Sequence, residues 1–320
     1  MLKIAGDCSG LGAFEVALNR LGIKYTLEFA SELNKYARTG YLSLHKPKTM
    51  YEDINQRDNT KYLKPLDLYF CGFPCQPFSS SRSRLGLNDS RGTIFYKCLE
   101  FIKANQPKIV VFENVRGLTN IDNGKTYNNI LNSLAGVNGS INGQISLDDI
   151  EGLGYHVYHK ILNSKDYNVA QNRERVFIVC FKYWRAFNFP KKIYRTKTLE
   201  DSLEKIVDDK YNVSKSTLEF FAKHRKTRGK KTDLYIDEDI AHTISARYHK
   251  QGAEDTYVRN HKGNPRRLTP LECFRLQGFS DEEYNKVRAS GLSETRQYSL
   301  AGNSITVDVL VEIFKKIYLK

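Results

Sequence analysis

Long apolar runs are missing from this 320-residue sequence. No segment approaches the roughly 18 consecutive apolar residues that a membrane-spanning helix needs. Residues 1–5 lead into a glycine-containing turn and not into the apolar stretch of a secretory signal. The six cysteines are scattered, mostly within apolar stretches, which favours reduced thiols over a disulfide framework. We therefore expect a cytoplasmic protein that has no membrane anchor.

Metal-ligand pairs and complete phosphate-binding motifs are also missing. Cys71 and Cys75 are near neighbours, but no second pair of Cys or His residues completes a tetrahedral zinc site. The sequence contains neither GxxxxGK[ST] nor a full GxGxxG motif. We expect no bound metal, and any nucleotide-type ligand must be held by a looser pattern.

Acidic residues are too few to balance the basic ones. The chain has 50 Lys and Arg against 36 Asp and Glu, a formal net charge of +14. This excess favours a polyanionic partner, with nucleic acid ahead of a membrane surface, although a solvated basic surface is the alternative. The hydrophobic fraction of 40% is sufficient for a sizeable core in one large domain, alone or with a smaller one.

Strand and helix patterns alternate through the first part of the chain. This order predicts a doubly wound α/β domain with a mostly parallel sheet. We interpret the glycine-rich residues 136–143 as a surface insertion. Strands are expected at residues 2–6, 25–30, near 50, 66–71, 108–112, 155–162 and 175–181, and helices at 14–21, 33–44, 94–104, 126–134 and 147–153.

The first predicted strand, turn and helix form a nucleotide-type cradle. Gly10 and Gly12 allow a ligand to approach the backbone where amide groups are free at the helix start. Glu32 follows the second strand, a usual place for an acid that binds ribose hydroxyls, although it also suits a helix N-terminus. Asp53 and Ile54 follow the third strand and are placed to meet an adenine edge. Together they indicate a cofactor that contains adenosine.

Cys75 and Glu113 each follow a predicted buried strand. Carboxyl ends of parallel strands share one edge of a sheet, where ligands bind, so a thiol and a carboxylate are expected to meet there. A buried structural cysteine and a helix cap are the simpler alternatives. Residues 79–89 read as a mobile basic loop. Arg173 and Arg175 enter the last strand of this region, where arginine is unusual unless it is paired or faces a site.

After Tyr183 the sequence becomes strongly polar. Residues 184–265 predict a small irregular domain with strands at 240–248 and 255–258 and a basic run at 223–231. This run contains Lys223, Arg225 and Arg228, which suit phosphate contacts or a solvated face. A helix is expected at 269–279, with Pro270 at its start, and a last helix opens at residues 300–304 and continues to 317.

In this order the motifs resemble those of the C5-cytosine DNA methyltransferases of the prokaryotic or phage restriction-modification type. The resemblance covers nearly the whole chain. It rests on Pro74-Cys75-Gln76, residues 89–95, Glu113-Asn114-Val115, the arginines of Gln171-x-Arg173-x-Arg175, the stretch from Arg267-Leu268-Thr269-Pro270 to Gly278-Phe279, and Gly302-Asn303-Ser304.

This resemblance implies a Rossmann-like methyltransferase with a smaller, irregular DNA-recognition domain. Residues 1–183 and 298–320 would form the discontinuous catalytic and cofactor-binding domain, and residues 184–297 the target-recognition domain with its hinge. The cofactor would be S-adenosyl-L-methionine, released as S-adenosyl-L-homocysteine. The partner would be double-stranded DNA, bound by a monomer. A cognate restriction endonuclease would belong to the same system without forming a stable complex.

The same resemblance assigns the catalytic roles. Cys75 would add as a thiolate to carbon 6 of cytosine, and positive charge from Arg173 and Arg175 would favour the thiolate. Glu113 would share a proton with N3, which requires a partly protonated acid of the kind that burial favours. Arg175 would hold the O2 oxygen. The base would be flipped into the pocket, and the loop at 79–94 would close behind it.

The remaining assignments concern the cofactor and DNA. Two departures from the family pattern affect the cofactor: Cys8 replaces a usual aromatic residue, and Asp7 replaces an apolar one. Thr243 matches a threonine that contacts the DNA backbone. The expected cofactor residues are Cys8, Gly10, Leu11, Gly12, Glu32, Leu33, Asp53, Ile54, Pro74, Ile94, Asn303 and Ser304; the expected DNA contacts are Gln76, Ser79, Ser81, Arg91, Lys223, Arg225, Arg228, Thr243 and Arg247.

Two other functions remain open at this point. One is methylation of cytosine in tRNA, because a branch of the same family acts on tRNA. The other is a catalytically inactive DNA-binding relative, against which the intact Cys75, Glu113 and Arg175 argue. The target sequence does not follow from these residues, since base contacts depend on a few side chains of an irregular domain.

Overall fold

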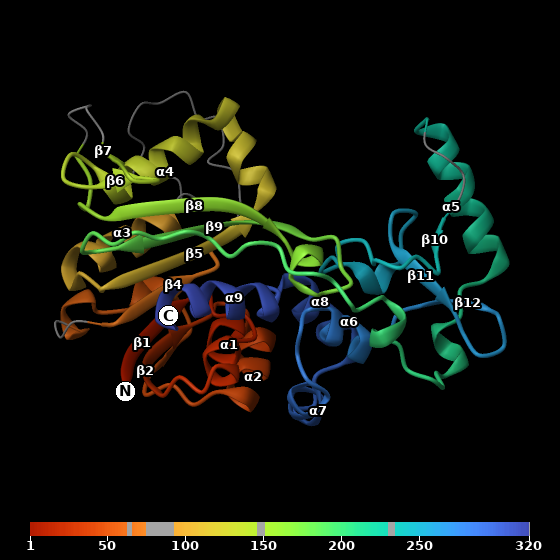
Figure 1. Ribbon diagram of the computed structural model, residues 1–320. Coiled ribbons are helices and arrows are strands. Elements are labelled where there is room, and N and C mark those ends of the chain that lie inside the picture. Colours follow the sequence, from red (N-terminus) through yellow and green to blue (C-terminus); the bar gives the residue numbers. More distant parts are fainter. Residues whose placement is uncertain (63–65, 75–92, 146–150, 230–233, 320) are drawn as a thin grey trace. The chain divides into compact units, whose positions relative to one another are not determined.

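We describe a computed structural model of the chain that covers residues 1–62, 66–74, 93–145, 151–229 and 234–319 (Figure 1). The chain divides into two compact units. Unit 1 comprises Met1–Leu162, Glu174–Pro190 and Val311–Lys320, and unit 2 comprises Asn163–Arg173 and Lys191–Leu310. The domain boundaries at 183/184 and 297/298 were drawn from motif order, and they stay a prediction.

The described residues of unit 1 contain a nine-stranded sheet in the order β3-β2-β1-β4-β5-β9-β8-β6-β7. Strands β1, β2, β4 and β5 run parallel, and β9 runs antiparallel to β5. This confirms the predicted doubly wound, mostly parallel sheet. The strands are β1 (Leu2–Asp7), β2 (Tyr25–Ser31), β3 (Met50–Tyr51), β4 (Leu68–Cys71), β5 (Ile109–Val115), β6 (Ser140–Ile141), β7 (Gln144–Ile145), β8 (His156–Asn163) and β9 (Glu174–Phe181).

Helices cover both faces of this sheet because successive strand residues point to opposite sides. Phe70 of β4 stacks on Phe14 of α1 with ring centroids 4.5 Å apart, whereas its neighbour Tyr69 meets Phe101 of α3 at 4.8 Å. Phe314 of α9 also contacts Phe14. The helices concerned are α1 (Ala13–Arg20), α2 (Lys35–Leu44), α3 (Thr93–Asn105), α4 (Lys125–Ala135) and the C-terminal part of α9 (Val307–Tyr318).

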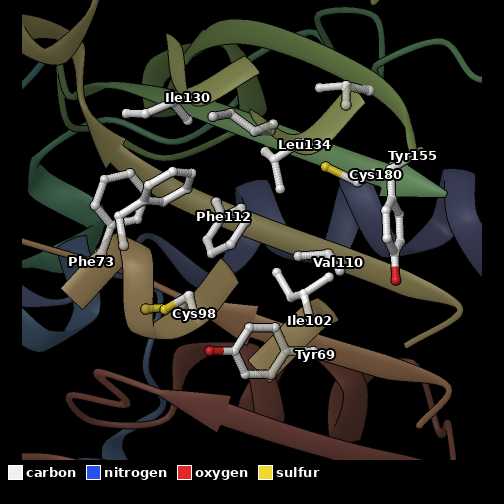
Figure 2. Close-up of a cluster of buried hydrophobic side chains, with 14 of the residues drawn as sticks. Tyr69, Phe73, Cys98, Ile102, Val110, Phe112, Ile130, Leu134, Tyr155 and Cys180 are labelled. Carbon is white, nitrogen blue, oxygen red and sulfur yellow. The ribbon is translucent and has the colours of Figure 1, made fainter. Parts of the chain in front are cut away.

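The face covered by α3 and α4 holds the main core of unit 1. Figure 2 shows Val110 and Phe112 of β5 beside Ile102 of α3, and Leu134 of α4 reaches the same cluster. All four side chains are fully buried. Each buried side chain of this size contributes about 1.5–3 kcal/mol, so this core fixes the strands whose carboxyl ends carry the candidate site.

The described part of unit 2 combines short strands with helices. Its elements are α5 (Lys215–Thr227), β10 (Tyr235–Ile236), β11 (Thr256–Arg259), β12 (Pro265–Arg267), α6 (Pro270–Leu276), α7 (Asp281–Ala289) and α8 (Glu294–Asn303). Helix α6 begins as predicted, with Pro270 in its first turn and a capping box between Thr269 and Glu272. Glu272 also forms a buried two-pronged ion pair with Arg266, each N–O distance being 2.7 Å.

Two predictions for residues 136–155 differ from the described structure. Residues 136–143 lie only partly on the surface: Val137, Asn138, Asn142 and Gly143 are exposed, whereas Gly136 and Gly139 are buried and β6 pairs with β8. Of the helix predicted at 147–153, residues 146–150 lie outside the described residues and 151–153 are not helical. The Leu153 amide instead donates to the Ser133 carbonyl at 3.0 Å, which satisfies an acceptor at the end of α4.

Two further predictions fail in unit 2. Residues 240–248 make an isolated bridge at Ala241 and then a turn, not a strand. The last helix does not open at 300–304, because α8 ends at Asn303 and α9 begins at Val307. The reason is visible in the hydrogen bonds: the carbonyls of Gly302 and Ser304 accept from the Arg173 side chain, so the chain is held extended between the two helices.

Candidate active site

The turn after β1 has an alternating backbone. Cys8, Gly10 and Gly12 have φ angles of 52°, 54° and 77°, and α1 begins directly afterwards. Nothing lies within 4 Å of the place a side chain on Gly10 would take. The left-handed conformation explains the glycines, and at Gly10 it leaves open space against the backbone for a ligand.

Glu32 lies against this turn. Its Oε2 atom accepts a hydrogen bond from the Gly10 amide at 2.9 Å, and its Oε1 atom accepts from the Asn34 amide at the same distance. A carboxylate oxygen has two lone pairs, so Glu32 retains acceptors for a ligand hydroxyl. Leu33 beside it is 73% exposed.

Asp53 and Ile54 follow β3, as predicted. Asp53 accepts from the Asn55 amide at 2.9 Å and caps a single 3₁₀ turn. Ile54 is partly buried and packs against the main core. Cys8 is also partly buried against this core, so the place where the family has an aromatic ring holds a small thiol.

Behind the turn lies a buried polar cluster that sequence analysis missed. The Nε2 atom of His45 donates to the Leu11 carbonyl at 3.1 Å, and burial lowers the pKa of His45 to about 4. A Cβ on Gly12 would lie 2.2 Å from that Nε2 atom. Tyr41 donates to the buried Glu15 carboxyl, and burial raises the pKa of Glu15 to about 7. These contacts fix the position of the turn.

Asp7, the other departure from the family pattern, has a buried partner. Its carboxylate forms an ion pair with Arg57 and accepts hydrogen bonds from Ser31 and Tyr69. The Arg57 guanidinium also lies 4.3 Å from the centroid of the Phe101 ring. Because the charge is fully paired, Asp7 is tolerated at the end of a buried strand.

The predicted nucleophile lies just beyond a described anchor. Asn114 at the end of β5 donates its side-chain amide to the carbonyl of buried Phe73 at 2.8 Å. Phe73 comes two positions before Cys75, so this bond fixes the chain leading to the thiol. Pro74 is exposed and Ile94 is half-buried. The predicted residues Cys75, Gln76, Ser79, Ser81 and Arg91, and the predicted loop at 79–89, lie outside the described residues.

Glu113 and Arg175 meet at the end of β5. The Arg175 Nε atom lies 3.1 Å from Glu113 Oε1. Register explains the contact, because Glu113 pairs with Phe177 and Val115 with Arg175 across two antiparallel strands, which makes the two side chains diagonal neighbours on one face. Burial lowers the pKa of the Arg175 guanidinium, and the Glu113 charge opposes that shift.

Arg173 has a different surrounding from the one predicted. Its guanidinium donates to the carbonyls of Ile244, Gly302 and Ser304 at 2.8–3.0 Å, all within unit 2. This is a structural role and differs from the expected support of a thiolate. Ser304 is thereby held through its backbone, while Asn303 is exposed at the end of α8.

The predicted DNA contacts fall into two groups. Lys223, Arg228, Thr243 and Arg247 are exposed, and Thr243 donates to the Asn172 carbonyl at 2.7 Å. Arg225 is only 4% exposed. It pairs with Glu254 at 3.2 Å and lies 4.4 Å from the Tyr235 ring centroid. Arg225 therefore holds α5 in place, which differs from the predicted DNA contact.

The described edge of the doubly wound sheet carries a glycine-containing turn after β1 and, where the end of β5 lies beside the start of β9, a paired acid and arginine. This is the arrangement of a Rossmann-like α/β enzyme, with the site at the carboxyl ends of the strands. None of the helices in the described ranges is both long and apolar enough to cross a membrane.

The family model of the C-5 cytosine-specific DNA methylases matches residues 3–319, and the chain belongs to this family. It is 32% identical to the type II methyltransferase M.NlaX of Neisseria lactamica, over 97% of this chain and 94% of the relative. It is 29% identical to the orphan methyltransferase M.SPRI of Bacillus phage SPR, over 99% and 97%.

A solved structure confirms the fold. The crystal structure of the S. pombe Dnmt2 methyltransferase matches with a TM-score of 0.76 at 20% identity, covering 98% of this chain and 97% of that one. The predicted family, the predicted fold class and the predicted enzyme class, a DNA cytosine-5-methyltransferase, are thus confirmed.

Proposed function

We propose that this enzyme transfers a methyl group from S-adenosyl-L-methionine to carbon 5 of a flipped cytosine within a short sequence of duplex DNA. The observation that carries the proposal is the buried Glu113–Arg175 pair on the edge to which Asn114 anchors the chain before Cys75. An acid, a cation and a thiol are the groups that this reaction needs.

Cys75 is the nucleophile of the proposal. Its thiolate forms a bond to carbon 6 of the cytosine, and the electron pair displaced from the C5–C6 double bond makes carbon 5 nucleophilic. Asn114 donates to the carbonyl of Phe73, which precedes Cys75 by two positions in the sequence. After methyl transfer, a base removes the proton from carbon 5, the bond between Cys75 and carbon 6 breaks so that the thiolate leaves, and N3 returns its proton to Glu113.

Glu113 and Arg175 act on the polar edge of the same ring. Glu113 gives a proton to N3 as the thiolate adds, and Arg175 donates to O2 where negative charge develops. Because their side chains are only 10% and 15% exposed, the low local dielectric strengthens both interactions. A cytosine reaches them only when it is flipped out of the duplex.

The cradle after β1 suits the cofactor, which supplies an electrophilic methyl sulfonium when bound. Gly10 and Gly12 let the ligand approach the backbone, and Glu32 accepts from ribose hydroxyls with its remaining lone pairs. Asp53 and Ile54 meet the adenine. Cys8 offers less stacking surface than an aromatic ring, so we expect modest cofactor affinity.

The remaining assignments are also part of this proposal. The exposed Lys223, Arg228, Thr243 and Arg247 contact the DNA, while Asn303 meets the methionine end of the cofactor. Residues 184–297 recognise the target. The enzyme acts as a monomer in a restriction-modification system beside a cognate endonuclease.

Bisulfite sequencing tests the reaction directly. An unmethylated plasmid is incubated with the purified protein and S-adenosyl-L-methionine, in parallel with a Cys75→Ala control. Cytosines protected within one short recurring sequence, and only by the wild-type protein, are the expected result. Methylation of tRNA but not of the plasmid, or protection that persists in the Cys75→Ala control, would contradict the proposal.

A further inference from the structure

A short basic segment opens the second stretch of unit 2, Lys191–Leu310. Residues Lys191–Lys197, which we call the basic ribbon, contain Lys191, Lys192, Arg195 and Lys197. The three lysines are exposed. Between these cations Tyr194 is 89% exposed, more than any other large apolar or aromatic side chain in the described part of the chain.

The ribbon is held in a fixed conformation by two side chains. Asn168, at a left-handed φ of 59°, accepts from the amides of Thr196 and Lys197 at 2.8 and 3.1 Å. Asp166 accepts from the Ile193 amide through its carbonyl at 3.0 Å, and its carboxylate pairs with Lys192 at the same distance. The backbone that carries the cations is therefore preorganised, which lowers the entropic cost of binding a ligand.

Hydrogen bonds also tie the ribbon to Thr243, the proposed backbone contact. Asn168 lies on the same segment as Asn172, whose carbonyl accepts from the Thr243 hydroxyl at 2.7 Å. Four residues of fully extended chain span at most about 14 Å. Base pairs of a duplex rise by about 3.4 Å, so Asn168 and Asn172 are separated by the length of at most about four base pairs.

We propose that the basic ribbon binds phosphates of duplex DNA beside the target sequence, through Lys191, Arg195 and Lys197, with the Tyr194 hydroxyl as a further donor. This inference rests on the proposed function. Lysine, arginine and tyrosine are all common donors to phosphate oxygens. Lys192 is left out because it already pairs with Asp166. Contacts of this kind position the duplex and carry no sequence information.

Charge complementarity favours duplex DNA as the ligand of the basic ribbon. The ribbon gathers its cations on one short segment of a chain whose net charge is +14, and a DNA duplex presents a regular array of phosphates. Each phosphate that a cation neutralises releases counterions, so log K falls against log salt concentration with a slope of about −0.9 per contact. The slope of log K against log salt concentration therefore measures the number of phosphate contacts.

The test is the triple variant Lys191→Gln/Arg195→Gln/Lys197→Gln. We expect the slope of log K against log salt to become shallower by about 2.7 for duplexes with and without the target. Affinity at fixed salt should fall equally for both duplexes, and kcat at saturating DNA should not change. Tyr194→Phe, which removes only the hydroxyl, should weaken binding of both duplexes about tenfold.

A matched control removes the same charge elsewhere. Lys24→Gln/Lys103→Gln/Lys316→Gln replaces three exposed lysines. Lys24 precedes β2 and Lys103 ends α3 before β5, so both lie by the amino ends of the strands, away from the carboxyl-end edge. This variant should keep the wild-type slope. The inference is overturned if the ribbon variant keeps that slope, if both variants lose slope equally, or if only target DNA or only tRNA is affected.

The two proposals fail in different ways. If the wild-type protein methylates no DNA in the bisulfite assay, the proposed function fails, whatever the slope shows. If it does methylate DNA and the ribbon variant binds both duplexes with the wild-type slope, only the ribbon inference fails. Unchanged thermal melting of the ribbon variant confirms that its exposed substitutions leave the fold intact.

Discussion

Arg175 places its Nε atom 3.1 Å from Oε1 of Glu113, where the start of β9 lies beside the end of β5 and the antiparallel register makes the two residues diagonal neighbours. Breaking a buried ion pair by removing one partner is more costly than the pair itself is worth, because a buried charge loses its counterion. The two residues therefore serve stability and catalysis together.

Glu113→Gln should separate these two roles. The amide keeps the size and remains a hydrogen-bonding group, so the protein should still fold and bind S-adenosyl-L-methionine. It cannot give its proton to N3, and the rate of methyl transfer should fall by about 10²–10⁴. Single-turnover methylation of a target duplex measures the rate, and calorimetry measures cofactor binding. A rate within tenfold of the wild-type value would contradict the proposed role.

Arg57→Met should be strongly destabilising. The substitution leaves the Asp7 carboxylate buried without its ion-pair partner, which costs about 3–5 kcal/mol of unfolding free energy. The double variant Asp7→Leu/Arg57→Met removes both charges and should recover much of the loss. Urea denaturation of the wild type, both single variants and the double variant measures the coupling. Additive effects would show that the pair is not an energetic unit.

Gly12→Ala should disable the turn after β1. The new Cβ would lie 2.2 Å from His45 Nε2, at a φ of +77° that side chains rarely adopt. We expect a stability loss of about 1–3 kcal/mol and at least a tenfold weaker affinity for S-adenosyl-L-methionine.

Gly22→Ala is the matched control for this prediction. Gly22 has a similar φ of +65°, nothing lies within 4 Å of its Cβ position, and it follows α1 away from the turn. This variant should lose stability from backbone strain alone and keep its cofactor affinity. Equal loss of cofactor affinity in both variants would show that the His45 contact is irrelevant.

Glu15 should make stability depend on pH. Burial raises its pKa from 4.5 to about 7 in the folded protein, so the folded state holds this proton more tightly than the unfolded state. The contribution to stability is fully present below pH 4.5 and is lost as the pH rises through 7, by roughly 3 kcal/mol in total.

Glu15→Gln should remove this dependence, because glutamine has no proton to lose and can still accept from Tyr41. The difference in unfolding free energy between variant and wild type, measured by urea denaturation from pH 4.5 to 8.5, should shift steadily in favour of the variant. The other titrating groups are common to both proteins and cancel. A difference in unfolding free energy that does not change with pH would contradict the conclusion that Glu15 is buried and protonated in the folded protein.

Most of the sheet was predictable because its strands are short apolar runs bounded by turn residues. β1, β2, β4, β8 and β9 all lie within a residue or two of their predicted ranges, and β5 continues three residues beyond its predicted end at 112. Helices α5, α7 and α8 were not predicted, since their sequences are largely polar; α5 and α7 also bury only two residues each. The extended break between α8 and α9 depends on Arg173, which lies far away in sequence.

The candidate site was likewise predictable only in part. Strand-end positions predicted that Glu113 would lie on the sheet edge, and the arginines of the next motif were expected to be paired or to face a site. The local sequence pattern could not show which arginine faces the site. Arg175 pairs with Glu113, whereas Arg173 donates to backbone carbonyls. Likewise a basic run does not reveal that Arg225 is buried. The ion pair of Asp7 with Arg57 was not predicted either, because the two residues are 50 positions apart in sequence.

The Asp7–Arg57 pair also limits how this protein can be changed or recombined. A chimera that takes residues 1–50 from this chain and the rest from a relative with an apolar residue at position 7 would inherit the acid without the arginine. The reverse exchange would bury a lone guanidinium. The two positions must therefore be inherited as a pair, so that neither substitution is neutral unless the other is already present.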